Sequence, residues 1–183
     1  MGWKSPRPQG PGNGLDIMDI YQPSILIIGY GNPGRLDDGL GPIFASKVEN
    51  WNLPNVTVEA GYQLSIEDAH LASIFDFAIF ADAATNTQKA YYFRELKPQF
   101  STAYTSHHLS PSNVLGIAHS LFESKVRGFE LGIRGYAFNE FGEKLSQKAT
   151  ENLDAAIEFL EPFMKYERSK LPDISMKFEP TAN

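Results

Sequence analysis

Short apolar blocks alternate with longer amphipathic stretches along this chain, and this pattern predicts strands separated by helices. Blocks of strand length cover residues 24–29, 56–59, 77–81 and 129–133, and a shorter, more polar block covers 91–94. Apolar residues recur at helical spacing in 40–48, 65–71, 110–122 and 143–161. The alternation predicts an α/β fold: a three-layer α/β/α sandwich with a mixed, mostly parallel five-stranded sheet.

Two features add detail to this prediction. The link from the block at 77–81 to the block at 91–94 is too short for a crossover helix, so we expect a hairpin. The block at 91–94 would then be an antiparallel strand at or near an edge of the sheet. Pro162 is expected to end or kink the longest helix, because proline lacks the N–H group that a helix interior needs.

The two ends of the chain differ in composition from its middle. Residues 1–23 are rich in proline and glycine and offer little apolar surface to bury, so we expect a disordered leader there. Residues 24–166 are expected to form a single domain, and residues 167–183 a C-terminal tail. The length of 183 residues is sufficient for one domain with a substantial core.

Charge and composition exclude several classes of partner. The net charge of −6, without a cluster of lysines and arginines, argues against nucleic acid. No apolar run approaches the roughly 18–20 residues that span a bilayer, so we expect no membrane insertion and a cytoplasmic location. The chain has no cysteine, which rules out disulfides, thiolate metal ligands and a cysteine nucleophile.

The most informative segment is residues 25–41, which read ILIIGYGNPGRLDDGLG. This pattern indicates a buried strand, a glycine-rich turn and the start of a helix. In an α/β sheet such a turn lies at the carboxyl end of a strand, where ligands usually bind. The turn carries Asp37 and Asp38 where a phosphate-binding loop needs bare backbone N–H groups. The segment therefore favours an enzyme that handles a metal over a nucleotide-binding module.

Three candidate functional residues each follow a strand or precede a helix. They are Asp38, Asp82 and one of the neighbouring histidines His107 and His108, and we expect them to meet at one edge of the sheet. Two carboxylates and an imidazole form a ligand set that suits nickel, iron, zinc or manganese. Asp37 has two interpretations, as a functional acid or as a residue that only supports the start of the helix.

The pattern GxGNPxxxDDGxG over residues 29–41 resembles the N-terminal signature of the hydrogenase maturation proteases. The resemblance extends in matching order from residue 25 to residue 160. It implies an endopeptidase that removes the C-terminal extension of a nickel–iron hydrogenase large-subunit precursor after nickel insertion. It also implies the same five-stranded α/β/α fold.

The resemblance further implies roles for individual residues. Asp38, Asp82 and His107 would bind nickel and form the catalytic site. His107 fits the family's spacing from the histidine to the following helix, and His108 is the alternative. The nickel would be carried by the hydrogenase precursor, so the protein is expected to hold no tightly bound metal of its own.

Two other functions remain open at this point. A non-catalytic nickel-binding maturation chaperone on the same fold would use the same ligands. A dinucleotide-binding module would use Gly29, Gly31 and Gly34 for the pyrophosphate and Glu59 for a ribose. The second alternative is disfavoured because Asp37 and Asp38 would repel the pyrophosphate at the start of the helix.

Overall fold

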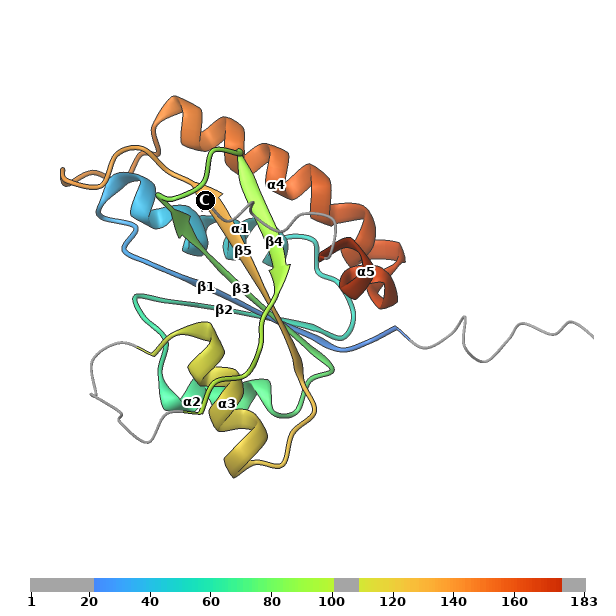
Figure 1. Cartoon of the computed structure of the whole chain (residues 1–183). Coiled ribbons are helices and arrows are strands. Elements are labelled where there is room, and N and C mark those ends of the chain that lie inside the picture. Colours follow the sequence, from blue (N-terminus) through green and yellow to red (C-terminus); the bar gives the residue numbers. More distant parts are fainter. Residues whose placement is uncertain (1–21, 101–108, 176–183) are drawn as a thin grey trace, which may run out of the picture.

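The computed structural model describes residues 22–100 and 109–175, whose arrangement is shown in Figure 1. Five strands form one sheet: β1 (Ile25–Tyr30), β2 (Val56–Gly61), β3 (Phe77–Ala84), β4 (Tyr91–Glu95) and β5 (Arg127–Arg134). The helices are α1 (Leu40–Glu49), α2 (Ile66–Ala72), α3 (Pro111–Leu121), α4 (Gln147–Tyr166) and α5 (Leu171–Ser175), with short 3-10 turns at η2 (Leu36–Gly39) and η3 (Arg168–Lys170). The predicted order of strands and helices is confirmed.

The strands lie in the order β2-β1-β3-β5-β4. All neighbouring pairs are parallel except β4 and β5, which are antiparallel, so the predicted mixed, mostly parallel sheet is confirmed. The predicted hairpin is wrong: β4 does lie at an edge, but it pairs with β5 and not with β3. The more apolar β5 takes the position between them, because its Phe129 and Leu131 are fully buried there.

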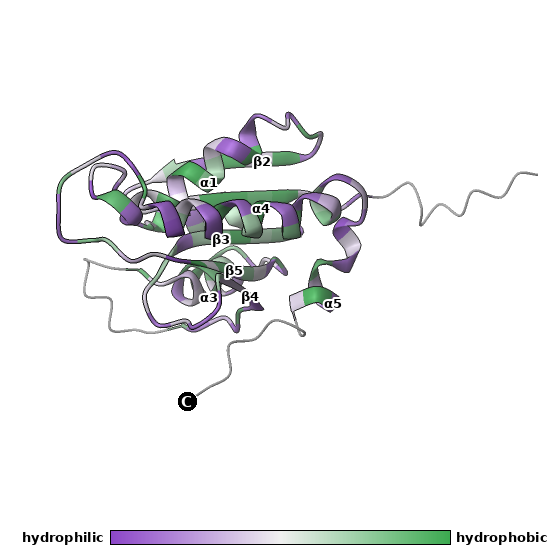
Figure 2. Cartoon of the chain, turned by 90° about the horizontal axis from the view of Figure 1, so that it is seen from above, coloured by the Kyte–Doolittle hydropathy of each residue, from purple (hydrophilic) through white to green (hydrophobic). Residues whose placement is uncertain are grey.

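Helices cover both faces of the sheet, with α1 and α4 on one side and α2 and α3 on the other (Figure 1). Alternate residues of each strand feed the two cores, so that Ile25 and Ile27 of β1 face α1 and α4 whereas Leu26 and Ile28 face α2 and α3. The view from above shows apolar residues along the central strands (Figure 2). The predicted three-layer sandwich is confirmed.

Serine side chains fix the starts of three helices. Ser65 and Ser110 each form a capping box with the residue three positions later, at the starts of α2 and α3. Ser146 caps α4, with its Oγ accepting from the N–H of Ala149 at 3.3 Å. The longest helix therefore begins at residue 147 and not at residue 143 as predicted.

Pro162 was expected to end or kink the longest helix, and it does not end it, because α4 continues to Tyr166. The proline leaves the carbonyl of Glu158 without its helical donor. Glu158 lies on the exposed side of the helix, where water can hydrate that carbonyl. Two residues after the proline, Met164 is fully buried in the core, and its burial favours continuing the helix.

Residues 168–175 belong to the folded unit. Leu171 and Ile174 are part of the core between the sheet and α4. The buried Arg168 donates hydrogen bonds to the carbonyls of Met164 at 2.7 Å and Pro54 at 2.8 Å. The predicted tail is therefore wrong for 168–175, whereas the leader over 1–21 and the tail over 176–183 lie outside the described residues and stay predictions.

Candidate functional site

The glycine-rich turn holds Asp38 at the carboxyl end of β1. Gly31 has a φ of 134°, a conformation that side chains disfavour, and this turns the chain out of the sheet. The backbone N–H of Asn32 then donates to Oδ2 of Asp38 at 3.0 Å. One hydrogen bond orients this half-buried carboxylate without enclosing it.

Helix α1 begins unusually close to the sheet. A Cβ atom on Gly41 would lie 2.4 Å from the carbonyl oxygens of both Tyr30 and Ala81, so only glycine fits there. The first turn of α1 therefore packs directly on the ends of β1 and β3. This contact brings Asp38, two residues before the helix, next to the end of β3.

Asp37 has a structural role. Its side chain is fully buried and accepts four hydrogen bonds, from the backbone N–H groups of Tyr136, Ala137 and Ser146 and from the Ser146 hydroxyl, at 2.7–2.9 Å. Burial favours the neutral carboxyl, but these hydrogen bonds outweigh burial and hold the pKa of Asp37 below its usual value. Asp37 thus ties the turn after β1 to the segment between β5 and α4.

Asp82 lies inside β3, because the strand runs to Ala84 and not to Ala81 as predicted. Its Oδ1 accepts from the N–H of Ala83 at 2.7 Å, and the Tyr30 hydroxyl donates a second hydrogen bond to the carboxylate. Burial raises the pKa of Asp82 to about 6 despite these hydrogen bonds, and the negative charges of Asp38 and Glu130 add to the rise. Asp38 and Asp82 are therefore close enough to repel each other across the end of the sheet.

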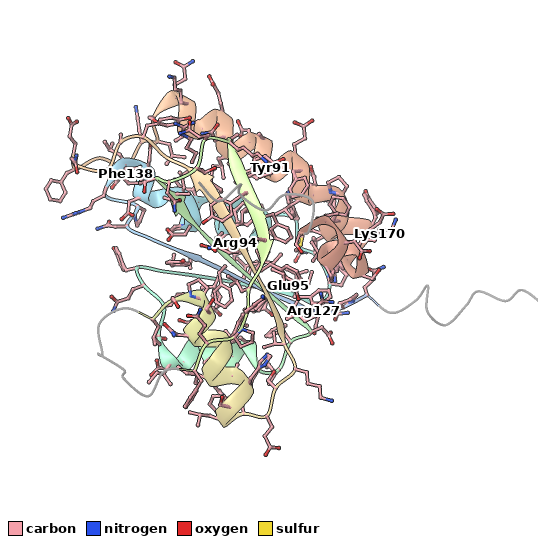
Figure 3. The ribbon with its side chains drawn as sticks, viewed as in Figure 1. Tyr91, Arg94, Glu95, Arg127, Phe138 and Lys170 are labelled. Carbon is pink, nitrogen blue, oxygen red and sulfur yellow. The ribbon has the colours of Figure 1, made fainter. Side chains whose placement is uncertain are left out.

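Glu130 continues this cluster on the next strand and was missed by the sequence analysis. Its two carboxylate oxygens accept from the Tyr92 hydroxyl at 3.0 Å and from Nε of Arg94 at 2.7 Å. Arg94, labelled in Figure 3, also places its Nη2 2.5 Å from Glu130. The signal in the sequence was a single acid between the buried Phe129 and Leu131 of a central strand.

Tyr92 is the residue of this cluster on β4. Its ring covers Gly132, where an added Cβ would lie 2.2 Å from the ring atoms. Burial, reinforced by the charge and hydrogen bond of Glu130, raises the pKa of the Tyr92 phenol, and burial raises that of Tyr30 in the same way. We call Tyr30, Asp82, Glu130 and Tyr92 the acid–tyrosine row, because they lie on one face of four neighbouring strands.

The expected metal ligands are only partly covered by the structure. Asp38 and Asp82 lie at the same end of the sheet, whereas His107 and His108 lie outside the described residues. Within 22–100 and 109–175, no group of three histidine, aspartate or glutamate residues is arranged to hold a metal ion. The two acids therefore offer part of a ligand set, and the roles of Asp38, Asp82 and His107 stay predictions.

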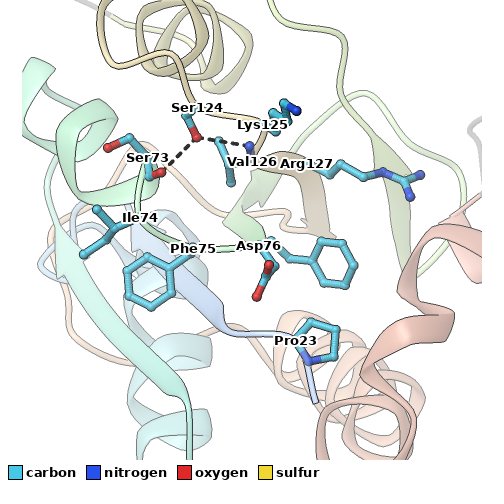
Figure 4. Close-up of a pocket in the computed structure, with 10 residues that line it drawn as sticks. Pro23, Ser73, Ile74, Phe75, Asp76, Ser124, Lys125, Val126 and Arg127 are labelled. Atoms are coloured by element: carbon cyan, nitrogen blue, oxygen red, sulfur yellow. Dashed lines mark hydrogen bonds between the residues drawn. The ribbon is translucent and has the colours of Figure 1, made fainter. Parts of the chain in front are cut away.

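A hollow of about 410 Å³ lies at the other end of the strands, away from this site. Figure 4 shows that it is lined by residues at and before the starts of β3 and β5, among them Phe75, Asp76 and Arg127. Asp76 accepts hydrogen bonds from the N–H and hydroxyl of Ser24 at 2.8 and 2.7 Å, which join the starts of β1 and β3. The carboxylate of Asp76 therefore has a structural role.

The described part of the chain has no helix that is long and apolar enough to cross a membrane. No family model matches the sequence, and no curated protein matches it.

The fold of this chain is similar to that of a class of solved structures, the hydrogenase maturation proteases. HycI from Thermococcus kodakarensis is 20% identical, with a TM-score of 0.60 over 77% of this chain and 92% of that one. A hydrogenase 3 maturation protease is 16% identical, with a TM-score of 0.61 over 87% and 97% of the two chains. HybD from E. coli is 19% identical, with a TM-score of 0.53 over 76% and 91%. The chain shares the fold of these proteins, as the sequence resemblance implied.

Proposed function

We propose that this protein is an endopeptidase that removes the C-terminal extension from the large-subunit precursor of a nickel–iron hydrogenase after nickel insertion. The observation that carries the proposal is the placement of Asp38 and Asp82, within electrostatic reach of each other, at the carboxyl ends of β1 and β3. The shared fold with hydrogenase maturation proteases supports the same function.

In this proposal, Asp38 and Asp82 bind the nickel that the precursor carries. The two carboxylates repel each other, and the burial of Asp82 adds to the cost of its charge. A divalent cation between them removes both penalties, which favours a metal-bearing substrate. His107 supplies the third ligand from this protein, with His108 as the alternative, and the precursor supplies the remainder.

The protein itself would hold no resident metal. Two carboxylates and one imidazole at an open edge form a weaker site than a closed set of four ligands. Only a precursor that has received its nickel is then cleaved, because cleavage requires contact of the nickel with Asp38 and Asp82. We place the protein in the cytoplasm, where it would meet the precursor.

The test is an incubation of the purified protein with nickel-loaded precursor from the same organism, followed by mass spectrometry of the precursor. We expect loss of the C-terminal extension at a single bond. A matched incubation uses Asp154→Asn, which removes one exposed carboxylate from α4 and should leave cleavage unchanged. An intact extension after incubation with a nickel-binding wild-type protein would favour the chaperone alternative.

The dinucleotide-binding alternative has little support in the structure. The acids that disfavour it are in place, because Asp38 lies at the turn where the pyrophosphate would bind. Glu59 lies on β2 with its side chain exposed. Calorimetric titration with NAD should show no binding.

A further inference from the structure

β2 is an open edge of the sheet beside the candidate site. Within the described residues it pairs only with β1. The N–H of Ile25 donates to the carbonyl of Asn55 at 2.9 Å, and the N–H of Gly31 donates to the carbonyl of Gly61 at 3.0 Å. In a parallel ladder these bonds alternate along the strand, so every second residue of β2 directs its backbone groups away from β1.

The outward-facing residues are Val56, Val58 and Ala60. Their N–H and C=O groups have no partner strand within 22–100 and 109–175, and the end of β2 from Glu59 to Gly61 is exposed. The opposite edge of the sheet differs, because α5 packs against β4 there. Among the described residues, the edge of β2 is therefore the one left open to another strand.

An apolar pocket lies where this edge meets the candidate site. It has a volume of about 190 Å³ and is lined by Gly31, Pro33, Pro42, Ala60, Gly61 and Tyr62. None of these side chains is charged, and the Tyr62 side chain is 72% exposed beside the pocket.

The pocket adjoins Asp38 through the glycine-rich turn. A Cβ on Gly31 would lie 2.1 Å from the backbone carbonyl oxygen of Asp38, and the neighbouring Asn32 binds the Asp38 carboxylate. A peptide that follows the edge of β2 to its carboxyl end would thus reach the pocket and the Asp38 carboxylate together.

We propose that the C-terminal extension of the hydrogenase precursor binds as an added strand along the outer edge of β2 and inserts an apolar side chain into this pocket. This inference rests on the proposed function, since it names the surface that presents the substrate to Asp38. An added strand satisfies the outward backbone groups of Val56, Val58 and Ala60, and the pocket selects one side chain. The exposed Glu59 favours a lysine or arginine on the facing part of the peptide.

Amide hydrogen exchange gives a direct test of strand addition. The probe is a synthetic peptide with the sequence of the precursor's C-terminal extension and the residues before the cleavage point, without nickel. We expect the amides of Val56, Val58 and Ala60 to exchange at least about tenfold more slowly when the peptide is bound. The amides of Thr57 and Glu59 face β1 and should change little. Peptide binding without slower exchange at the outward-facing amides would overturn the proposal.

Two variants test the pocket. Ala60→Leu fills it, and the fold should tolerate the change because Ala60 is exposed on the edge strand. Tyr62→Ala removes one wall. We expect each variant to raise the KM for nickel-loaded precursor about tenfold, because burying one apolar side chain changes affinity by about that factor. The kcat should change less than about twofold.

Tyr166→Ala is the matched control. Tyr166 is 74% exposed at the end of α4, so the control removes a tyrosine of equal exposure far from the pocket. If wild-type protein cleaves the precursor and both pocket variants keep its KM, the docking proposal fails and the protease function stands. If wild-type protein leaves the extension intact, the proposed function itself fails.

Discussion

The carboxylates of Asp37 and Asp82 lie at the same end of the sheet, but their surroundings are opposite. Asp37 is surrounded by four hydrogen-bond donors from residues 136–146, and its pKa is held low. Asp82 is half-buried, receives two donors and faces the negative charges of Asp38 and Glu130, and its burial together with these charges raises its pKa to about 6.

The charged form of Asp37 therefore stabilises the native state, whereas the charged form of Asp82 destabilises it. Hydrogen bonds from the β5–α4 segment satisfy Asp37, so its charge favours the native state. The charge of Asp82 opposes folding at neutral pH, because the native state raises its pKa. Charged residues that destabilise the native state in this way are concentrated at functional sites. The contrast supports a functional role for Asp82 and a structural role for Asp37.

The largest stability effect should come from Asp37→Asn. The amide N–H₂ group would face the buried donors of Tyr136, Ala137 and Ser146, so we expect a loss of about 3–5 kcal/mol in the free energy of unfolding. Urea titration at pH 7 measures it. The pKa of Asp37 is lowered, so its contribution is present above about pH 4 and disappears as the pH falls through its native pKa. Wild type and variant should therefore converge in acid, and an equally stable variant at pH 7 would contradict the assigned role.

The largest activity effect should come from Asp38→Asn. The amide keeps the shape of the side chain but loses the charge that favours a divalent cation, so kcat/KM for nickel-loaded precursor should fall at least about 100-fold. The free energy of unfolding should stay within about 1 kcal/mol of wild type, because a single hydrogen bond from Asn32 is affected. Initial rates of cleavage measure the change. Equal activity in Asp38→Asn and wild type would contradict a functional role for Asp38 beside the structural Asp37.

Asp82→Asn should stabilise the protein while it abolishes processing. The native pKa of about 6 lies above the unfolded value of about 4, so the native state binds more protons than the unfolded state between these pH values. The stability of wild type should therefore fall as the pH rises from 4 to 6, and the variant should avoid this loss. We expect a gain of about 1–3 kcal/mol at pH 7 that disappears near pH 4. Urea titrations at both pH values test the sign, and a variant less stable than wild type at pH 7 would refute it.

The smallest effect should come from Tyr92→Phe in the acid–tyrosine row. The ring still covers Gly132, and Arg94 still binds Glu130, so only one hydrogen bond of 3.0 Å is lost. We expect a destabilisation of about 0.5–1.5 kcal/mol by urea titration. A loss above about 3 kcal/mol would show that the row, like Asp37, stabilises the fold.

Most of the fold was predictable from the sequence because local signals specify it. Alternating apolar blocks gave the strands, and serines such as Ser65 and Ser110 marked helix starts. The partner of β4 was not predictable in this way, since it depends on which strand fills the centre of the sheet. Pro162 does not end α4, because the burial of Met164, a tertiary effect, outweighs the local preference of proline.

For the site, the placement of Asp38 and Asp82 at one end of the sheet was predictable, whereas their roles and that of His107 stay predictions. Asp38 and Asp82 stand out because each acid lies beside an apolar strand. The roles of Asp37 and Glu130 depend on donors far away in the sequence, such as Ser146 for Asp37 and Arg94 for Glu130, which no local pattern reveals. Long-range hydrogen bonds therefore identify Asp37 as a structural acid, which the local sequence left open.

The most direct test of the account compares nickel-loaded and nickel-free precursor as substrates for protein that has been treated with a chelator and then freed of it. The account predicts that the treated protein cleaves the nickel-loaded precursor at the wild-type rate and leaves the nickel-free precursor intact, because Asp38 and Asp82 act on the metal of the substrate. Efficient cleavage of the nickel-free precursor by the treated protein would contradict it.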